Sequence, residues 1–285
     1  EDFTATDGTT IVLTEPAQVS AQLIIVCPKM ESNYTAPSVG ANWSTASLGQ
    51  AFINSPHVKT ERFGKSVSVS GNYMAVGIDG EDTGAPSYLT DAGAVNIYYK
   101  SSGTWSLQQS VTASTQLQNK FFGSNVVLKG DLLFVSEPGV SSSPPYGGTS
   151  NIGAVHIFTR SGTTWTRQST ITSPVVQSGN EFGMAMSFDN GTLAVGAYRD
   201  TTNGSGSGAA YIYTVTSGGN ATLQATVRGS DSTTNDQFGI SVAISGDLLA
   251  VGARYQDTGG SNAGAGYIFT RSGTSWTQAQ KVTAS

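Results

Sequence analysis

Charged side chains are scarce in this sequence of 285 residues, because Asp, Glu, Lys and Arg together make up only 12% of it. Their usual share in soluble proteins is roughly 25%. The formal net charge is -5, and no stretch of the chain concentrates Lys or Arg. A surface that neutralises nucleic-acid phosphates needs such a basic patch. We therefore expect no nucleic-acid partner.

Long apolar runs and cysteines are also scarce. The longest apolar run is Leu23 to Cys27, far short of the roughly 18 residues that a membrane-spanning helix needs. We expect no membrane insertion and interpret this run as a buried strand. Cys27 is the only cysteine, which excludes a disulfide within the chain. Its apolar neighbours favour a buried free thiol, and a disulfide to another chain is the alternative.

Glycine, in contrast, is abundant, with 35 residues, and Ser, Thr and Asn are frequent. This composition suits short strands joined by tight turns, but it also suits disorder, so periodicity has to decide. Phe-Gly pairs recur at intervals of 59, 60 and 56 residues, starting at Phe63, Phe122, Phe182 and Phe238. A repeat of this length indicates an array of similar structural units.

Each Phe-Gly pair opens the same succession of four short segments. An alternating segment such as Ser241–Ile244 is followed by a Gly-containing turn and a second apolar segment such as Leu249–Gly252. After a variable loop, Gly-Ala opens a third segment, and a fourth begins with Trp in three of the four repeats. The period-two alternation and the β-branched and aromatic residues predict strands. The tight turns predict antiparallel hairpins.

One four-stranded sheet cannot bury both of its faces, whereas sheets stacked radially around an axis can. The sequence therefore predicts an all-β protein, a β-propeller of four-stranded antiparallel blades. We place four clear repeats at residues 63–121, 122–181, 182–237 and 238–285. Residues 1–62 are a divergent N-terminal segment that we interpret as a partial blade.

The Phe-Gly starts, together with the later Val-Gly-Ala that begins at Val195 and Val251, resemble the FG-GAP repeats of integrin α-subunit propellers. The resemblance covers residues 63–285. It implies a propeller, commonly of seven blades, that serves adhesion or ligand recognition through its loop faces. Four clear repeats and one divergent segment leave two alternatives: a closed five-bladed ring, or part of a seven-bladed ring in a longer chain.

Integrin-type repeats often carry an Asp-rich calcium loop between their first and second strands. In every clear repeat of this chain the same connection is a turn of two to three residues. Such a turn cannot supply the six to eight oxygen ligands that Ca²⁺ takes. We therefore expect no calcium site of this kind and no cofactor.

Candidate ligand-binding residues lie in the loop after the second strand. Asp-Thr pairs begin there at Asp82, Asp200 and Asp257. They predict either a set of polar groups for a metal or a sugar, or turns in which Asp bonds to nearby backbone, and we favour the turns. Tyr146 lies in a Pro-containing insertion of the second repeat, which predicts either a contact surface or a solvated loop.

No serine-hydrolase elbow, zinc-protease helix or phosphate-binding loop is present in the sequence. We therefore expect a non-enzymatic binding, adhesion or structural assembly module, with a protein partner or self-assembly. A lectin-like propeller that binds carbohydrate is the alternative. A glycoside-acting enzyme with paired carboxylates is a weaker one.

Five Asn-x-Ser/Thr sequons favour an extracellular or cell-surface glycoprotein, because such sites are glycosylated in secreted proteins. The sequons begin at Asn33, Asn42, Asn190, Asn203 and Asn220. A chain rich in Asn, Ser and Thr also produces sequons by chance, so a bacterial surface protein without glycans is the alternative.

Overall fold

The computed structural model describes most of the predicted repeat region. The described residues are 61–82, 90–113, 118–139, 152–175, 177 and 179–283, with strand residues 3–5 and 11–13. The chain divides into two compact units, Glu1–Gly49 and Gln50–Ser285. Within the first unit, β1 (Phe3–Ala5) pairs with β2 (Ile11–Leu13) in an antiparallel sheet. Cys27 and the rest of the predicted partial blade lie outside the described residues.

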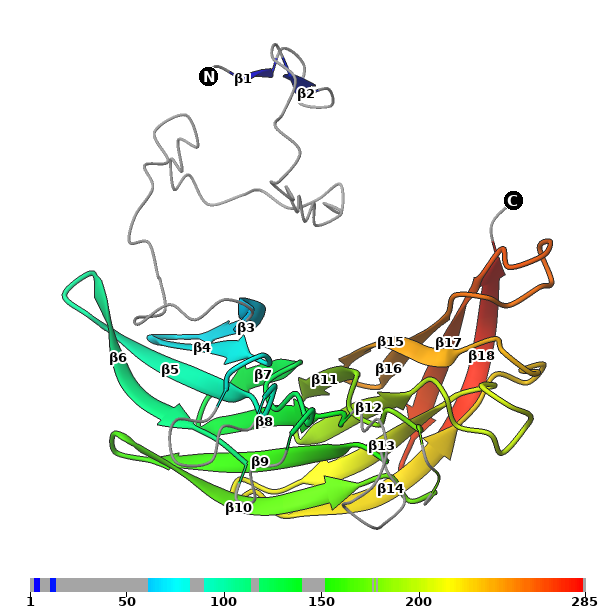
Figure 1. Cartoon of the computed structure of the whole chain (residues 1–285). Coiled ribbons are helices and arrows are strands. Elements are labelled where there is room, and N and C mark those ends of the chain that lie inside the picture. The colour runs from blue at the N-terminus through cyan, green and yellow to red at the C-terminus, as the bar shows by residue number, and fades with distance from the viewer. Residues whose placement is uncertain are drawn as a thin grey trace. The chain divides into compact units, whose positions relative to one another are not determined.

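The second unit contains four separate sheets, each of four antiparallel strands in sequential order (Figure 1). Blade 1 consists of β3 (Phe63–Ser70), β4 (Tyr73–Ile78), β5 (Ala94–Ser101) and β6 (Thr104–Val111). Blade 2 consists of β7 (Val126–Lys129), β8 (Leu132–Glu137), β9 (Ala154–Ser161) and β10 (Thr164–Thr172). Blade 3 consists of β11 (Ala185–Asp189), β12 (Thr192–Ala197), β13 (Ala209–Val215) and β14 (Ala221–Val227). Blade 4 consists of β15 (Phe238–Ser245), β16 (Leu248–Ala253), β17 (Ala265–Ser272) and β18 (Ser275–Thr283).

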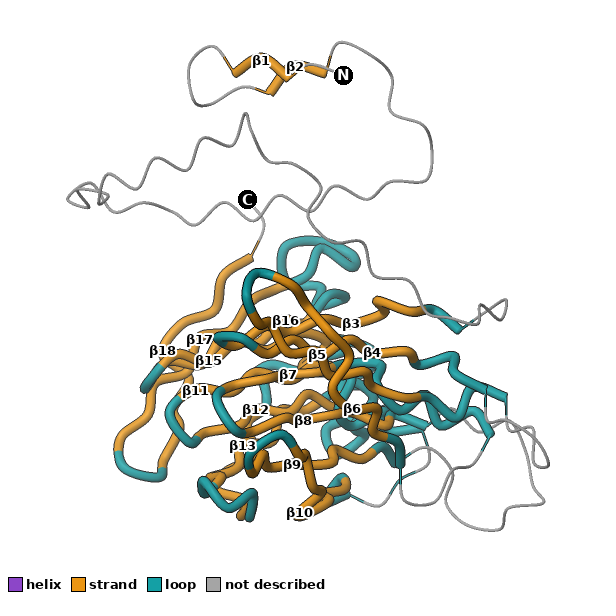
Figure 2. The backbone as a smooth tube through the Cα atoms, turned by 90° about the vertical axis from the view of Figure 1, so that its left-hand side faces the viewer, coloured by secondary structure: helices purple, strands orange, loops and turns teal. Residues whose placement is uncertain are grey.

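These sheets confirm the predicted fold class of four-stranded antiparallel blades. Strands and loops account for all of the described residues, as Figure 2 shows. No helix long and apolar enough to cross a membrane occurs in the described part of the chain. Neighbouring blades contact one another in chain order through their first strands, β3 with β7, β7 with β11, and β11 with β15.

The Phe of each later Phe-Gly pair anchors its own blade. Phe122, Phe182 and Phe238 are all 0% exposed. Phe238 packs edge-on against Phe269 of the third strand, with ring centroids 6.0 Å apart and an interplanar angle of 82°. Blades 2 and 3 repeat this geometry. Edge-on aromatic pairs of this kind add stability beyond the area they bury.

The Phe-Gly pair and the Gly-Ala pair, far apart within one repeat, meet between neighbouring blades. Gly93 of blade 1 forms a parallel bridge with Phe122 of blade 2, and Gly208 of blade 3 does the same with Phe238 of blade 4. Gly93 has a φ of +85°, and a Cβ there would lie 2.1 Å from the carbonyl oxygen of Phe122. Only glycine fits such a close approach. We call this contact the interblade joint.

The apolar cores also lie between blades. Ile97 of blade 1 packs with Leu128 and Leu133 of blade 2, and Ile212 of blade 3 packs with Leu249 of blade 4. Each blade therefore uses one face for the preceding blade and the other face for the following blade. This arrangement explains why a single repeat does not bury its own apolar residues.

Candidate functional site

The Asp residues of the Asp-Thr loops are engaged within their own blades. The Asp82 carboxylate accepts a hydrogen bond from the backbone N–H of Asp91 at 2.9 Å, and that of Asp257 accepts one from Asn262 at 2.7 Å. Among the described residues, no group of three or more His, Cys, Asp or Glu side chains could hold a metal ion. These two aspartates are thus bonded as loop-shaping residues.

Asp200 is fully buried and ties its loop to the third strand of blade 3. It accepts hydrogen bonds from the Tyr211 hydroxyl at 2.5 Å, the Thr202 backbone N–H at 2.9 Å and the Arg228 guanidinium at 3.3 Å. Burial raises the pKa of this carboxyl, but the bonds from Tyr211 and Thr202 and the charge of Arg228 outweigh it, so the pKa lies below its usual value. A carboxylate held in this way stabilises the blade and is closed to ligands.

The third-strand position of Tyr211 carries a hydrogen-bonded polar residue in two other blades as well. In blade 2, His156 lies 2.6 Å from Glu137 and 3.0 Å from Thr170. In blade 4, the Tyr267 hydroxyl donates to Asp231 at 2.8 Å. His156 therefore links β8, β9 and β10, whereas Tyr267 fastens the β14–β15 loop to β17.

The remaining predicted site residues fall into two groups. Tyr146, Asn33 and Asn42 lie outside the described residues. The other three sequon asparagines are exposed, at the β11–β12 turn and in two loops: Asn190, Asn203 and Asn220. Glycosylation at these positions stays a prediction.

Blade 1 exposes apolar side chains at positions that the other blades bury fully or in part. Val67 and Val69 of β3 are 63% and 59% exposed. The equivalent residues of blade 2, Val126 and Leu128, are 4% and 3% exposed because they pack against blade 1. Ile244, the counterpart of Val69 in blade 4, is 7% exposed and packs against blade 3. Among the described residues, no other blade covers this interblade face of blade 1.

Blade 4 shows the complementary exposure on its opposite face. Val282 of β18 is 50% exposed, whereas its counterparts Val111 and Val227 are 6% and 4% exposed. A Cβ on Gly64 would meet nothing within 4 Å, and one on Gly264 would meet only backbone of its own blade. Gly64 and Gly264 are thus the two open halves of an interblade joint.

We call the exposed surface of the first blade the blade-1 end face, which comprises Gly64, Val67 and Val69. The blade-4 end face comprises Gly252, Gly264 and Val282. Gly252 is included because a Cβ on its blade-3 counterpart, Gly196, would lie 2.0 Å from the carbonyl oxygen of Gly239 in the following blade.

This architecture defines the chain as a β-propeller-type repeat protein, built from blades that dock through a repeated joint. Residues 165–213 and 221–269 match the FG-GAP repeat. Each match runs from the outer strand of one blade through the first three strands of the next, so it contains the Phe-Gly half of one joint and the Gly-Ala half of another. These two segments are therefore FG-GAP repeats, which confirms the resemblance drawn from the Phe-Gly pairs.

Two solved structures resemble this chain at low sequence identity. One is a protein from Lactobacillus plantarum, with a TM-score of 0.50 and 10% identity over 77% of this chain and 55% of that one. The other is Saccharomyces cerevisiae Sqt1, with a TM-score of 0.47 and 11% identity over 79% of this chain and 49% of that one. The chain spans about half the length of each. The first likeness supports the fold alone, and no curated protein matches the sequence.

Proposed function

We propose that this chain is an extracellular, non-enzymatic module that binds a protein partner and assembles through its two end faces. FG-GAP repeats are typical of extracellular or surface proteins, which supports the compartment. The exposed sequon asparagines Asn190, Asn203 and Asn220 are accessible to glycosylation and support it further.

The observation that carries the proposal is the pair of complementary end faces. Within the chain, an apolar face like that of blade 4 packs against a face like that of blade 1 at every interblade contact. Both partners of such a contact are exposed at the ends of the described blades, at Val67, Val69 and Val282. Apolar burial contributes about 25 cal/mol per Å², so covering these faces favours association. A second copy of this chain carries the matching surface.

A contact between one end face and the other is head to tail, so it joins two different surfaces. Repetition of such a contact yields a closed ring or an extended filament, depending on the rotation between copies. Either product suits a structural or adhesive role at a cell surface. The internal pairing of Asp200 and His156 supports a role without catalysis, because both groups are already committed to structural bonds.

Sedimentation velocity of the purified chain over a range of concentrations tests this proposal. The wild type should associate as concentration rises, and Val69→Asp should abolish association, because it places a charge in an apolar contact. Leu223→Asp is the matched control, since Leu223 is an exposed residue, at 42%, that belongs to neither end face. A wild type that stays monomeric, or equal losses for both variants, would contradict end-face assembly.

A further inference from the structure

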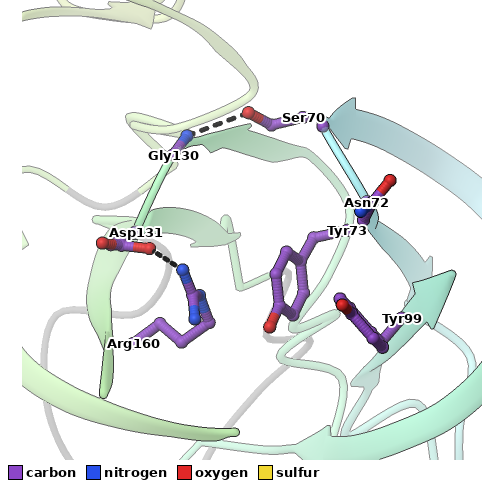
Figure 3. A pocket seen from close by; sticks show the side chains of 8 residues that line it. Ser70, Asn72, Tyr73, Tyr99, Gly130, Asp131 and Arg160 are labelled. Carbon is purple, nitrogen blue, oxygen red and sulfur yellow. Dashed lines mark hydrogen bonds and ion pairs between the residues drawn. The ribbon is translucent and has the colours of Figure 1, made fainter. Parts of the chain in front are cut away.

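A solvent-facing cavity of about 390 Å³ lies between blades 1 and 2 (Figure 3). The β3–β4 and β7–β8 hairpin turns line it, together with Tyr73, Tyr99 and Arg160. Its size lies within the roughly 300–1,000 Å³ of small-molecule sites. In an antiparallel blade these turns lie at the strand ends opposite to the Asp-Thr loops. The cavity is therefore on a different surface from the candidate ligand-binding residues of the sequence analysis.

The cavity contains an aromatic pair that the blade scaffold does not require. Tyr73 and Tyr99 are direct cross-strand partners, and their ring centroids lie 4.9 Å apart at an interplanar angle of 47°. Equivalent pairs in the other blades have no aromatic residue: they are Leu132 with Thr159, Thr192 with Thr214, and Leu248 with Thr270. Three blades form with Leu or Thr at these positions. Tyr73 also packs edge-on against Trp165 of blade 2, with ring centroids 5.8 Å apart, so Tyr99 is the tyrosine that packing between the blades does not explain.

A cation from the next blade completes the cavity. The Arg160 guanidinium lies over the Tyr73 ring, 4.5 Å from its centroid, and forms an ion pair with Asp131. Figure 3 shows Tyr73 between Arg160 and Tyr99, with Asp131 across the cavity. Because the guanidinium and the carboxylate neutralise each other, the cavity carries no net charge from this pair.

The corresponding place between blades 3 and 4 is closed. There, Arg271 donates a hydrogen bond at 2.9 Å to the hydroxyl of Thr192 on the preceding blade, and Thr192 is only 3% exposed. In blade 1 the same strand position is Tyr73, which stacks on the arginine instead of bonding to it. The same repeat position thus holds an arginine that closes the space between blades 3 and 4, as Arg271, and lines the cavity between blades 1 and 2, as Arg160.

We propose that this Tyr73–Tyr99 cavity binds a neutral saccharide. Because Arg160 and Tyr99 flank the Tyr73 ring, the C–H face of a sugar ring stacks on Tyr99. Its hydroxyls exchange hydrogen bonds with the Asp131 carboxylate, the Asn72 amide and the tyrosine hydroxyls. Because Arg160 and Asp131 are already paired with each other, a charged ligand would have to compete with this ion pair for either group. A wholly apolar ligand would leave these polar groups without partners as it displaced water. The proposal goes beyond end-face assembly and does not depend on it.

Isothermal titration calorimetry with cellohexaose, laminarihexaose, mannohexaose and chitohexaose tests the proposal, with a sulfated heparin hexasaccharide as the charged comparison. At least one neutral hexasaccharide should bind the wild type. The double variant Tyr73→Leu/Tyr99→Thr reproduces the pair found in blades 2 and 4, so it should fold. It should weaken binding at least tenfold while the thermal midpoint of unfolding stays within a few degrees.

Two controls separate this site from other surfaces. Tyr255→Thr removes an exposed tyrosine elsewhere, 39% exposed on blade 4, and should leave saccharide affinity unchanged. Val69→Asp should likewise leave it unchanged, because the end face is not part of the cavity. The proposal is overturned if no neutral hexasaccharide binds the wild type at millimolar concentration, if the double variant binds equally well, or if the heparin hexasaccharide binds more tightly.

Discussion

Val69 of β3 and Ile244 of β15 occupy the same position of two repeats, yet Val69 is 59% exposed and Ile244 is 7% exposed. The difference arises because blade 3 covers Ile244. Ile244→Thr should therefore lower the free energy of unfolding by more than about 1 kcal/mol, since it places a hydroxyl in an apolar core. Val69→Thr should change it by less than about 0.5 kcal/mol. Urea unfolding at low protein concentration measures both, and equal losses would contradict the assigned interblade packing.

The close approach of backbones between blades predicts that two equivalent glycines differ in how well they tolerate substitution by alanine. A Cβ on Gly196 would lie 2.0 Å from the carbonyl oxygen of Gly239 in the next blade, whereas one on Gly252 would meet mainly the rotatable Ser241 hydroxyl. Gly196→Ala should destabilise the chain by about 1–3 kcal/mol, as overpacked sites do. Gly252→Ala should be tolerated. Thermal unfolding of the two variants distinguishes them, and a tolerated Gly196→Ala would count against the close approach of blades 3 and 4.

The buried carboxylate of Asp200 predicts a pH dependence. Its pKa is lowered on folding, so its contribution to stability is present above the unfolded pKa of about 3.9 and is lost as pH falls through the folded pKa. Asp200→Asn should lower the free energy of unfolding at neutral pH by about 1–3 kcal/mol and should flatten its acid dependence. Asp257→Asn, at an exposed loop residue, is the control. Parallel pH profiles for the wild type and Asp200→Asn would refute the assignment.

Glycosylation is a further prediction, because Asn190, Asn203 and Asn220 are exposed. Peptides of the native protein that contain these asparagines should be heavier than their sequences predict, and peptide N-glycosidase treatment should remove the excess. Asparagine-to-glutamine changes at the three positions should each remove one such modified peptide. Peptides at the bare sequence mass would show that these sequons are unused.

Much of the fold could be predicted from the sequence because its motifs perform repeated backbone tasks. A Phe-Gly pair recurs since its glycine lies where two backbones meet: Gly123 has a φ of +92°, and a Cβ there would lie 2.5 Å from the carbonyl oxygen of Ala94 in the preceding blade. The start of the first strand was harder to predict in blades 1 and 4. There it begins at the Phe of the Phe-Gly pair, Phe63 and Phe238, three residues before the alternating segment, whereas in blades 2 and 3 it begins with that segment, at Val126 and Ala185.

The candidate sites were harder to predict, since they depend on contacts between distant residues. Asp200 reads as a loop residue, and only the folded chain brings Arg228 to it across 28 positions. The Tyr73–Tyr99 pair left one signal in the sequence, namely that both residues depart from the Leu or Thr of the other repeats. Arg160 could not be assigned to the cavity without the packing of blade 2 on blade 1.

Association of the Gly252→Ala variant is the most direct test of end-face assembly. Gly77 and Gly196 occupy the same position in blades 1 and 3, and a Cβ at either would lie 2.0 Å from a backbone oxygen of the following blade. Gly252 lies on the blade-4 end face, so an added methyl group should block docking of a second copy without destabilising the fold. We predict that Gly252→Ala unfolds like the wild type but remains monomeric in sedimentation velocity at concentrations where the wild type associates. Wild-type association of this variant would contradict the account.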